Sequence, residues 1–121
     1  MSVRMVERLR KVAMRSAKPE SGRYRIAAAV LDKQGRVLST GTNSYMKTHP
    51  KQKEYAEKVA QHHKSFLHAE ISALVKVKNG TPYKMVVVRV GNNGDLRLAE
   101  PCPICKEAIR QAGIKVVEYT M

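Results

Sequence analysis

Apolar and polar positions follow two periods along the chain, and these periods predict helices and strands in turn. Residues 2–17 place apolar side chains at helical spacing, with basic residues mostly on the other side, which predicts an amphipathic helix. Residues 24–31 and 37–41 are β-prone runs on either side of an Asp-Lys-Gln-Gly turn, which predicts a hairpin. Two later strands are expected: a nearly continuous apolar run over 85–90, typical of the centre of a parallel sheet and followed by a short extension over 96–99, and a last strand over 114–119.

Two further helices are predicted in the second half of the chain. Residues 68–78 carry inward-facing apolar positions at helical spacing, and residues 101–112 form a second such segment that ends at Gly113. Pro101 and Pro103 are expected in the first turn of the later helix, where a missing N–H has no consequence.

A polar and basic segment, residues 43–65, separates the hairpin from these helices, and within it a short helix is predicted over 50–60. An insertion this long in a small domain is usually either functional or mobile. Strands that alternate with helices indicate an α/β layered domain with a mixed sheet. The length of 121 residues suits one compact domain, 1–121, and not two.

Composition narrows the class of protein. Apolar residues make up 43% of the chain and charged residues 27%, and no stretch approaches the roughly 18 consecutive apolar residues of a membrane span. Residues 1–10 lack the apolar block of a secretory signal. We therefore expect a soluble, cytoplasmic protein with no membrane partner.

The charge balance is strongly basic. The chain has 23 Lys and Arg against 10 Asp and Glu, a net charge of +13. Phosphate is the obvious partner for such a surface, whether on a nucleotide or on nucleic acid. The simpler interpretation is a solvated basic surface that only aids solubility.

Two short motifs, His68-Ala69-Glu70 and Pro101-Cys102-Pro103-Ile104-Cys105, carry the candidate chemistry. The chain has only two cysteines, three positions apart, and an intracellular pair at this spacing more often binds metal or does redox work than forms a disulfide. Each motif lies at the predicted start of a helix. Two such helices, packed side by side on a sheet, would bring these starts together.

Zinc fits this set of donors. It prefers four ligands in a tetrahedron and favours thiolate and imidazole. His68, Cys102 and Cys105 would supply three ligands to one Zn²⁺ per chain, which leaves one position open for a water molecule. Glu70, two residues from His68, could reach that water without being a ligand and move its protons.

Three other interpretations of these residues stay open. His68 could be a core histidine, and the two cysteines could be a redox pair or half of a structural zinc site. A structural site needs a fourth ligand, and the candidates are three histidines of the inserted segment: His49, His62 and His63.

The strings HAE and PCPIC resemble the signature of the cytidine deaminase-like superfamily of zinc-dependent deaminases. The resemblance covers roughly residues 24–120. It implies a three-layer α/β/α fold, zinc ligands at His68, Cys102 and Cys105, and Glu70 as the proton shuttle. It also implies attack of water on the amidine carbon of a base, with release of ammonia.

The same resemblance implies three substrate contacts. Asn43 stands in a Gly-Thr-Asn segment after the second strand, where family members contact the sugar or base; the alternative is an ordinary turn residue. The backbone N–H of Ala69 would bind the base carbonyl. The backbone carbonyl of Pro101 would accept a hydrogen bond from the amino group of the base.

The chain also departs from the family pattern, because it carries only one strand after the cysteine helix. We expect a short C-terminal form with a sheet of four strands, or a sheet that borrows an edge from a partner. An uncovered edge favours a homo-oligomer. The inserted segment 43–65 is expected to cover the mouth of the active site.

The substrate expected first is a free cytosine nucleoside or nucleotide. Only one Phe and five Tyr are present, which is few for a surface that stacks single-stranded bases. The second expectation is a nucleic-acid base, either cytosine in single-stranded DNA or adenosine in tRNA, because +13 exceeds what one phosphate requires. The third is a non-catalytic zinc module that binds nucleic acid.

Overall fold

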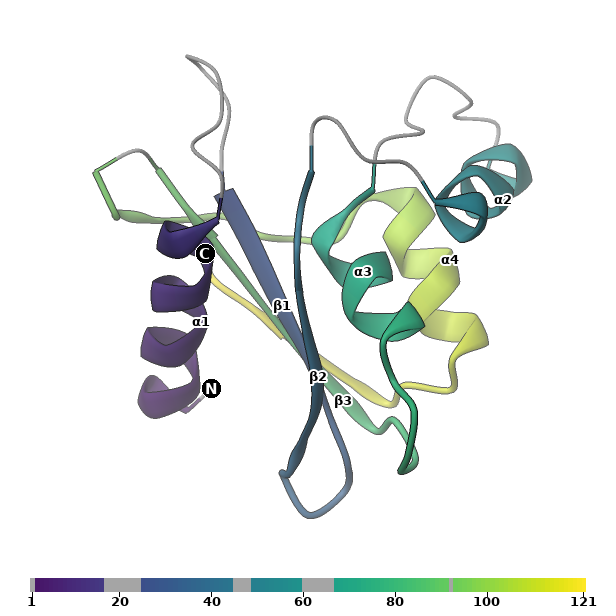
Figure 1. The fold of residues 1–121 in the computed structure, drawn as a ribbon, viewed down its shortest axis with the longest axis horizontal. Coiled ribbons are helices and arrows are strands. Elements are labelled where there is room, and N and C mark those ends of the chain that lie inside the picture. Colours follow the sequence, from purple (N-terminus) through teal and green to yellow (C-terminus); the bar gives the residue numbers. More distant parts are fainter. Residues whose placement is uncertain (1, 17–24, 45–48, 60–66, 92) are drawn as a thin grey trace.

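The computed structural model describes residues 2–16, 25–44, 49–59, 67–91 and 93–121. Its helices and strands follow in the order α1 (Val3–Arg15), β1 (Arg25–Leu31), β2 (Val37–Thr42), α2 (Pro50–Lys58), α3 (Ala69–Val75), β3 (Lys84–Val90), β4 (Leu96–Arg97), α4 (Pro103–Gln111) and β5 (Val116–Tyr119). Helix α1 covers one face of the sheet, and α3 and α4 cover the other (Figure 1). The predicted three-layer α/β/α fold is confirmed.

The sheet is mixed, as expected. Strand β1 lies between β2 and β3 and pairs with both in antiparallel orientation. On its other side β3 pairs with β5 in parallel orientation. The apolar run of β3 is therefore explained less by parallel pairing than by burial, because helices cover it on both faces.

The described part of the sheet has five strands where four were expected. The difference is β4, a two-residue strand that pairs with Arg89 and Val90 after the β5 pairing has ended at Val87. A turn makes this possible, since the N–H of Gly91 donates to the carbonyl of Asp95 at 2.9 Å. Strands β4 and β5 thus share one edge of β3, and β4 is the short extension predicted over 96–99.

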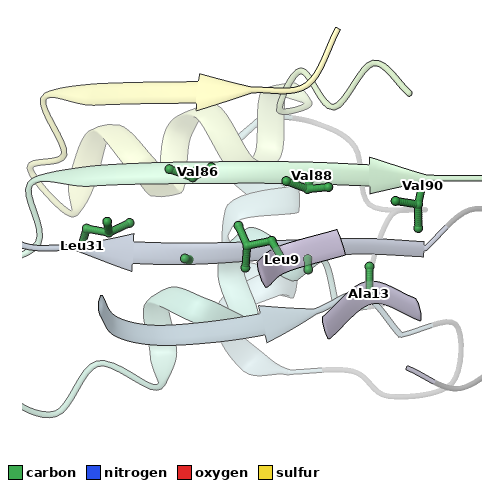
Figure 2. Packing of buried hydrophobic residues seen from close by; sticks show 8 residues of the cluster. Leu9, Ala13, Leu31, Val86, Val88 and Val90 are labelled. Atoms are coloured by element: carbon green, nitrogen blue, oxygen red, sulfur yellow. The ribbon is translucent and has the colours of Figure 1, made fainter. Parts of the chain in front are cut away.

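Side chains of the central strands alternate between two cores. Between α1 and the sheet the buried side chains labelled in Figure 2 meet: Leu9, Ala13, Leu31, Val86, Val88 and Val90. Their neighbours Ala28, Val30, Met85 and Val87 point to the opposite face, into the core under α3 and α4. The three consecutive alanines of β1 are fully buried and let helices approach the strand closely from both faces.

Two helix boundaries differ from those predicted. Helix α3 ends at Val75 and not at residue 78, because the N–H groups of Lys76 and Val77 turn to carbonyls three residues back and tighten the last turn. Helix α4 begins at Pro103, with Cys102 as its N-cap, so Pro101 precedes the first turn. The predicted ends at residues 17, 24 and 60 lie outside the described residues.

The helices are short. Helix α1 has 13 residues, whereas a membrane span needs about 20. Among the described residues no helix has the length and apolar character required to cross a bilayer.

Candidate metal centre

His68 and Cys102 occupy equivalent positions on two helices. His68 is the N-cap of α3 and Cys102 is the N-cap of α4. The two helices lie side by side on one face of the sheet (Figure 1). Neither residue uses its side chain to cap its helix. Both side chains are thus left to meet at the point where the two helix starts converge.

Cys105 joins them from the first turn of α4, and its side chain is buried. One donor atom from each of His68, Cys102 and Cys105 lies within 4.8 Å of the other two. In the described part of the chain this is the one such group of three or more His, Cys, Asp or Glu residues. The structure therefore brings together the three residues that the motifs singled out.

The distances in this cluster suit zinc. Nδ1 of His68 lies 3.3 Å from Sγ of Cys105 and 3.5 Å from Sγ of Cys102. Zinc bonds of about 2.0 Å to nitrogen and about 2.3 Å to sulfur, at the tetrahedral angle, separate the two donors by about 3.5 Å. Both cysteines are free thiols. One zinc ion fits between the three donors with little rearrangement.

The pKa values of the two thiols move in opposite directions. The Cys105 thiol donates a hydrogen bond to the Cys102 sulfur, and His68 adds to this effect, so that the pKa of Cys102 falls to about 3. The same hydrogen bond, together with burial and the charge of Glu70, raises the pKa of Cys105 well above its usual value. The pair thus holds one proton between two sulfurs. A divalent cation bound there would take the place of that proton.

Glu70 lies in the first turn of α3 and is buried, with 5% of its surface exposed. Burial is the main reason that the pKa of its carboxyl is raised. Charge on His68 and a hydrogen bond from Cys105 act in the opposite direction, which places the carboxyl against the same cluster. A carboxyl with a raised pKa holds a proton more firmly than an exposed carboxyl, which suits a group that takes up a proton and then passes it on.

Asn43 follows β2, and its carboxamide is fixed by the neighbouring strand. The side-chain Oδ1 of Asn43 accepts a hydrogen bond from the backbone N–H of Ile26 at 2.9 Å. The backbone N–H of Asn43 donates to the backbone carbonyl of Ile26 at 3.2 Å. The next residue, Ser44, donates its N–H to the carbonyl of Leu67 at 2.9 Å. This bond holds the segment after β2 beside the residue that precedes His68.

The other two residues predicted to bind substrate lie next to the donors. Ala69 is the first residue of α3 and is fully buried. Pro101 is buried and directly precedes Cys102. Both backbones therefore adjoin the convergence point of the two helices.

The histidines proposed as a fourth ligand are not part of the cluster as far as the structure describes them. His49 is the N-cap of α2, where Nδ1 of its ring accepts a hydrogen bond from the N–H of Lys51 at 3.0 Å. His62 and His63 lie outside the described residues.

Gly41 positions the site, and sequence reasoning gave it no role. A Cβ atom at Gly41 would lie 2.5 Å from the backbone nitrogen of Ala73 and 2.8 Å from the carbonyl oxygen of Ala69. Only glycine lets α3 rest this closely on β2. The signal was available, because an isolated glycine within a strand often marks close approach of another backbone.

Gln52 is a second residue that sequence reasoning missed. It belongs to α2, is fully buried, and accepts a hydrogen bond from the N–H of His68 at 3.0 Å. Nothing in the polar, charged sequence around it separates this glutamine from its exposed neighbours.

Three solved structures with a similar fold are deaminases. Cytidine deaminase from Mycobacterium tuberculosis is 20% identical over 98% of this chain and 85% of its own, with a TM-score of 0.59. Cytidine deaminase from Burkholderia pseudomallei is 17% identical over 96% of this chain and 83% of its own, with a TM-score of 0.59. The dCMP deaminase from cyanophage S-TIM5, in complex with dCMP and dUMP, is 22% identical over 98% of this chain and 82% of its own, with a TM-score of 0.54.

At these identities the solved structures show the fold alone, and no curated protein gives a significant match to the chain. The family comparison shows more than the fold. The family model of the cytidine and deoxycytidylate deaminase zinc-binding region matches residues 2–121. Because this match spans nearly the whole chain, the protein belongs to the family of that zinc-binding region, and zinc is its cofactor.

Proposed function

We propose that the protein is a zinc-dependent hydrolytic deaminase that converts a cytosine nucleoside or nucleotide to the uracil form and releases ammonia. One observation carries the proposal. A buried carboxyl, Glu70, lies against a cluster of one imidazole and two thiols at the joined starts of two helices. A site that only held zinc would have no use for this carboxyl.

In this proposal His68, Cys102 and Cys105 hold the zinc ion. When bound, zinc with an open coordination position lowers the pKa of a water molecule to about 7. The starts of α3 and α4 add the positive ends of two helix dipoles, which favour the thiolate forms of the cysteines.

Glu70 moves the protons. Its carboxylate accepts a proton from the attacking water while the water oxygen bonds to C4 of the cytosine ring and the electron pair of the C4=N3 double bond moves to N3, to which the carboxyl passes that proton. Glu70 then moves the proton of the new C4 hydroxyl to the exocyclic nitrogen, the C4=O bond forms as the exocyclic C–N bond breaks, and ammonia leaves. Burial of Glu70 keeps bulk water from competing for these protons.

Backbone groups orient the base. The N–H groups in the first turn of a helix need acceptors outside the helix, and Ala69 at the start of α3 could meet the base carbonyl. The carbonyl of Pro101 could accept from the amino group of the base. Asn43, with its carboxamide fixed by Ile26, is proposed to contact the sugar or base.

A cytosine substrate is supported by the family and by the likeness in fold to two cytidine deaminases and a dCMP deaminase. The net charge of +13 favours a phosphorylated substrate. The same charge leaves a nucleic-acid base as the second candidate, because one phosphate needs only a few cations.

Ammonia release from a panel of substrates tests the proposal. The panel contains cytidine, deoxycytidine, their monophosphates, and short RNA and DNA. We expect turnover of at least one free nucleoside or nucleotide. Turnover of oligonucleotides alone would favour the second candidate, a base in nucleic acid. Zinc-loaded protein that turns over nothing would favour a non-catalytic zinc module.

The proposal extends to assembly and location. Strands β2 and β5 each have a single partner strand in the described part of the sheet, and such edges invite pairing with a second copy. We therefore propose a homo-oligomer. We also place the enzyme in the cytoplasm, where two thiols at this spacing stay reduced and able to bind zinc.

A further inference from the structure

Gln52 is a polar side chain in an unusual place. Helix α2 lies within the inserted segment, and most of its residues are exposed and charged. Gln52 is fully buried instead, and its Oε1 accepts a hydrogen bond from the backbone N–H of His68 at 3.0 Å. Burying a carboxamide is costly unless its hydrogen bonds are made. This contact satisfies the carboxamide oxygen of Gln52 and the backbone N–H of His68 together.

Helix α3 cannot satisfy that N–H by itself. In a capping box the third helical residue is Glu or Gln, and its side chain reaches back to the N–H of the N-cap. The third residue of α3 is Ile71, which is 1% exposed and packed in the core. The N-cap side chain, that of His68, makes no capping hydrogen bond. Gln52 supplies from another helix the acceptor that α3 lacks.

Helix α2 is held firmly enough to serve in this way. Its Ala56 is fully buried in one apolar cluster with Ile104, Cys105 and Ala108 of α4. At the far end of the contact Nζ of Lys58 donates to Oε1 of Gln111 at 3.2 Å. Helix α2 therefore packs on the helix that carries the cysteines while Gln52 holds the residue that carries the imidazole.

We propose that Gln52 is a positioning residue of the metal centre, which fixes the backbone of His68 so that the imidazole meets the sulfurs of Cys102 and Cys105. The inference rests on the zinc site of the proposed function. It assigns the inserted helix a role in holding the metal centre together, in addition to any contact with substrate.

The test compares two substitutions of Gln52. Gln52→Met keeps the length of the side chain and removes the acceptor, whereas Gln52→Glu keeps an acceptor oxygen. We expect Gln52→Met to weaken zinc binding about 10- to 100-fold, as loss of a residue that orients a ligand typically does, and Gln52→Glu to restore much of the affinity. Zinc affinity is measured by competition with a chelator. The visible spectrum of the Co²⁺-loaded protein reports whether the ligand geometry changes.

Two controls separate positioning from general stability. Gln34→Met makes the same substitution at an exposed glutamine in the turn between β1 and β2. Leu9→Ala removes a buried side chain on the opposite face of the sheet and lowers the melting temperature. We expect both variants to bind zinc as the wild type does. If Leu9→Ala weakened zinc binding as much as Gln52→Met does, Gln52 would contribute only to general stability and would not be a positioning residue.

The outcomes distinguish this inference from the proposed function. Wild-type affinity in Gln52→Met overturns the role of Gln52 and leaves the zinc site intact. Zinc binding that survives His68→Ala overturns the site itself. If Gln52→Met fails to fold, hydrogen exchange of the His68 amide in the wild type decides: slow exchange supports the bond to Gln52, and free exchange rules it out.

Discussion

At the scale of single residues, the metal centre uses positions that would otherwise stabilise helices. His68 and Cys102 are both N-caps, and neither side chain accepts a hydrogen bond from its own helix. A Ser, Thr, Asp or Asn at such a position stabilises a protein by about 1 kcal/mol. Without metal, then, these two positions weaken their helices. In the proposed site, zinc bound by the same two side chains would join α3 to α4.

Cys102→Ser separates these two effects. Serine is a good N-cap but a poor zinc ligand, so we expect zinc content and the melting temperature of the zinc-loaded protein to fall together. In excess chelator the variant should be as stable as the wild type or slightly more stable. Elemental analysis and thermal unfolding with and without chelator measure both quantities. Full zinc occupancy in the variant would contradict the assignment of Cys102 as a ligand.

Glu70→Ala tests the proton shuttle. We expect turnover to fall by at least about 100-fold, the usual contribution of general acid–base catalysis, while zinc stays bound. The exposed Glu7 on α1 offers a control, because Glu7→Ala removes a carboxyl on the opposite face of the sheet. Rates of ammonia release and zinc content are compared for the three proteins. Loss of metal from Glu70→Ala would mean that Glu70 serves as a ligand and not as a shuttle.

At the scale of helices and strands, short-range sequence patterns predicted the elements that depend on neighbouring residues. The hairpin of β1 and β2 and the helices that begin near residues 68 and 102 follow from the sequence, because side-chain period and turn residues act over a few positions. The early end of α3 and the burial of Gln52 did not follow. The first depends on how the last turn of α3 tightens, and the second on a contact with His68, which is 16 residues away in the chain.

Gly41→Ala tests how α3 is seated on β2. The added Cβ would collide with backbone atoms of Ala73 and Ala69, which cannot rotate away as a side chain could. We expect a loss of about 1–3 kcal/mol in the free energy of unfolding, as for other overpacked sites. Because α3 carries His68, zinc affinity should fall as well.

Gly35→Ala is the matched control for this substitution. Gly35 has a φ of 87°, so alanine there is strained, but a Cβ would meet no atom within 4 Å. We expect the stability of the Gly35→Ala variant to fall while its zinc affinity stays unchanged. Chemical denaturation and chelator competition measure both properties. Unchanged zinc affinity in Gly41→Ala would show that α3 can shift on β2 without disturbing the metal centre.

At the scale of the whole molecule, the candidate metal centre lies on one face of the sheet and the other face is closed by α1 (Figure 1). The edges of the sheet are less well covered. Beyond β5, a groove of about 400 Å³ runs between that strand and α4, and Ile114, Val117 and Tyr119 give it an apolar lining. An open strand edge beside an apolar groove is the kind of surface that a second copy of the chain can cover.

The molar mass in solution should therefore exceed the monomer mass of 13.6 kDa. Light scattering over a dilution series measures it. Val116→Lys would place a charge on the β5 edge and should shift the equilibrium toward monomer, because charged side chains on edge strands oppose pairing. Val3→Lys makes the same change at an 83% exposed position on α1 and should leave the mass unchanged. A wild-type protein that stays at 13.6 kDa at every concentration while it remains active would show that one chain suffices for the site. Dissociation by both variants alike would instead point to an interface dominated by net charge, since each adds one unit to a chain that already carries +13.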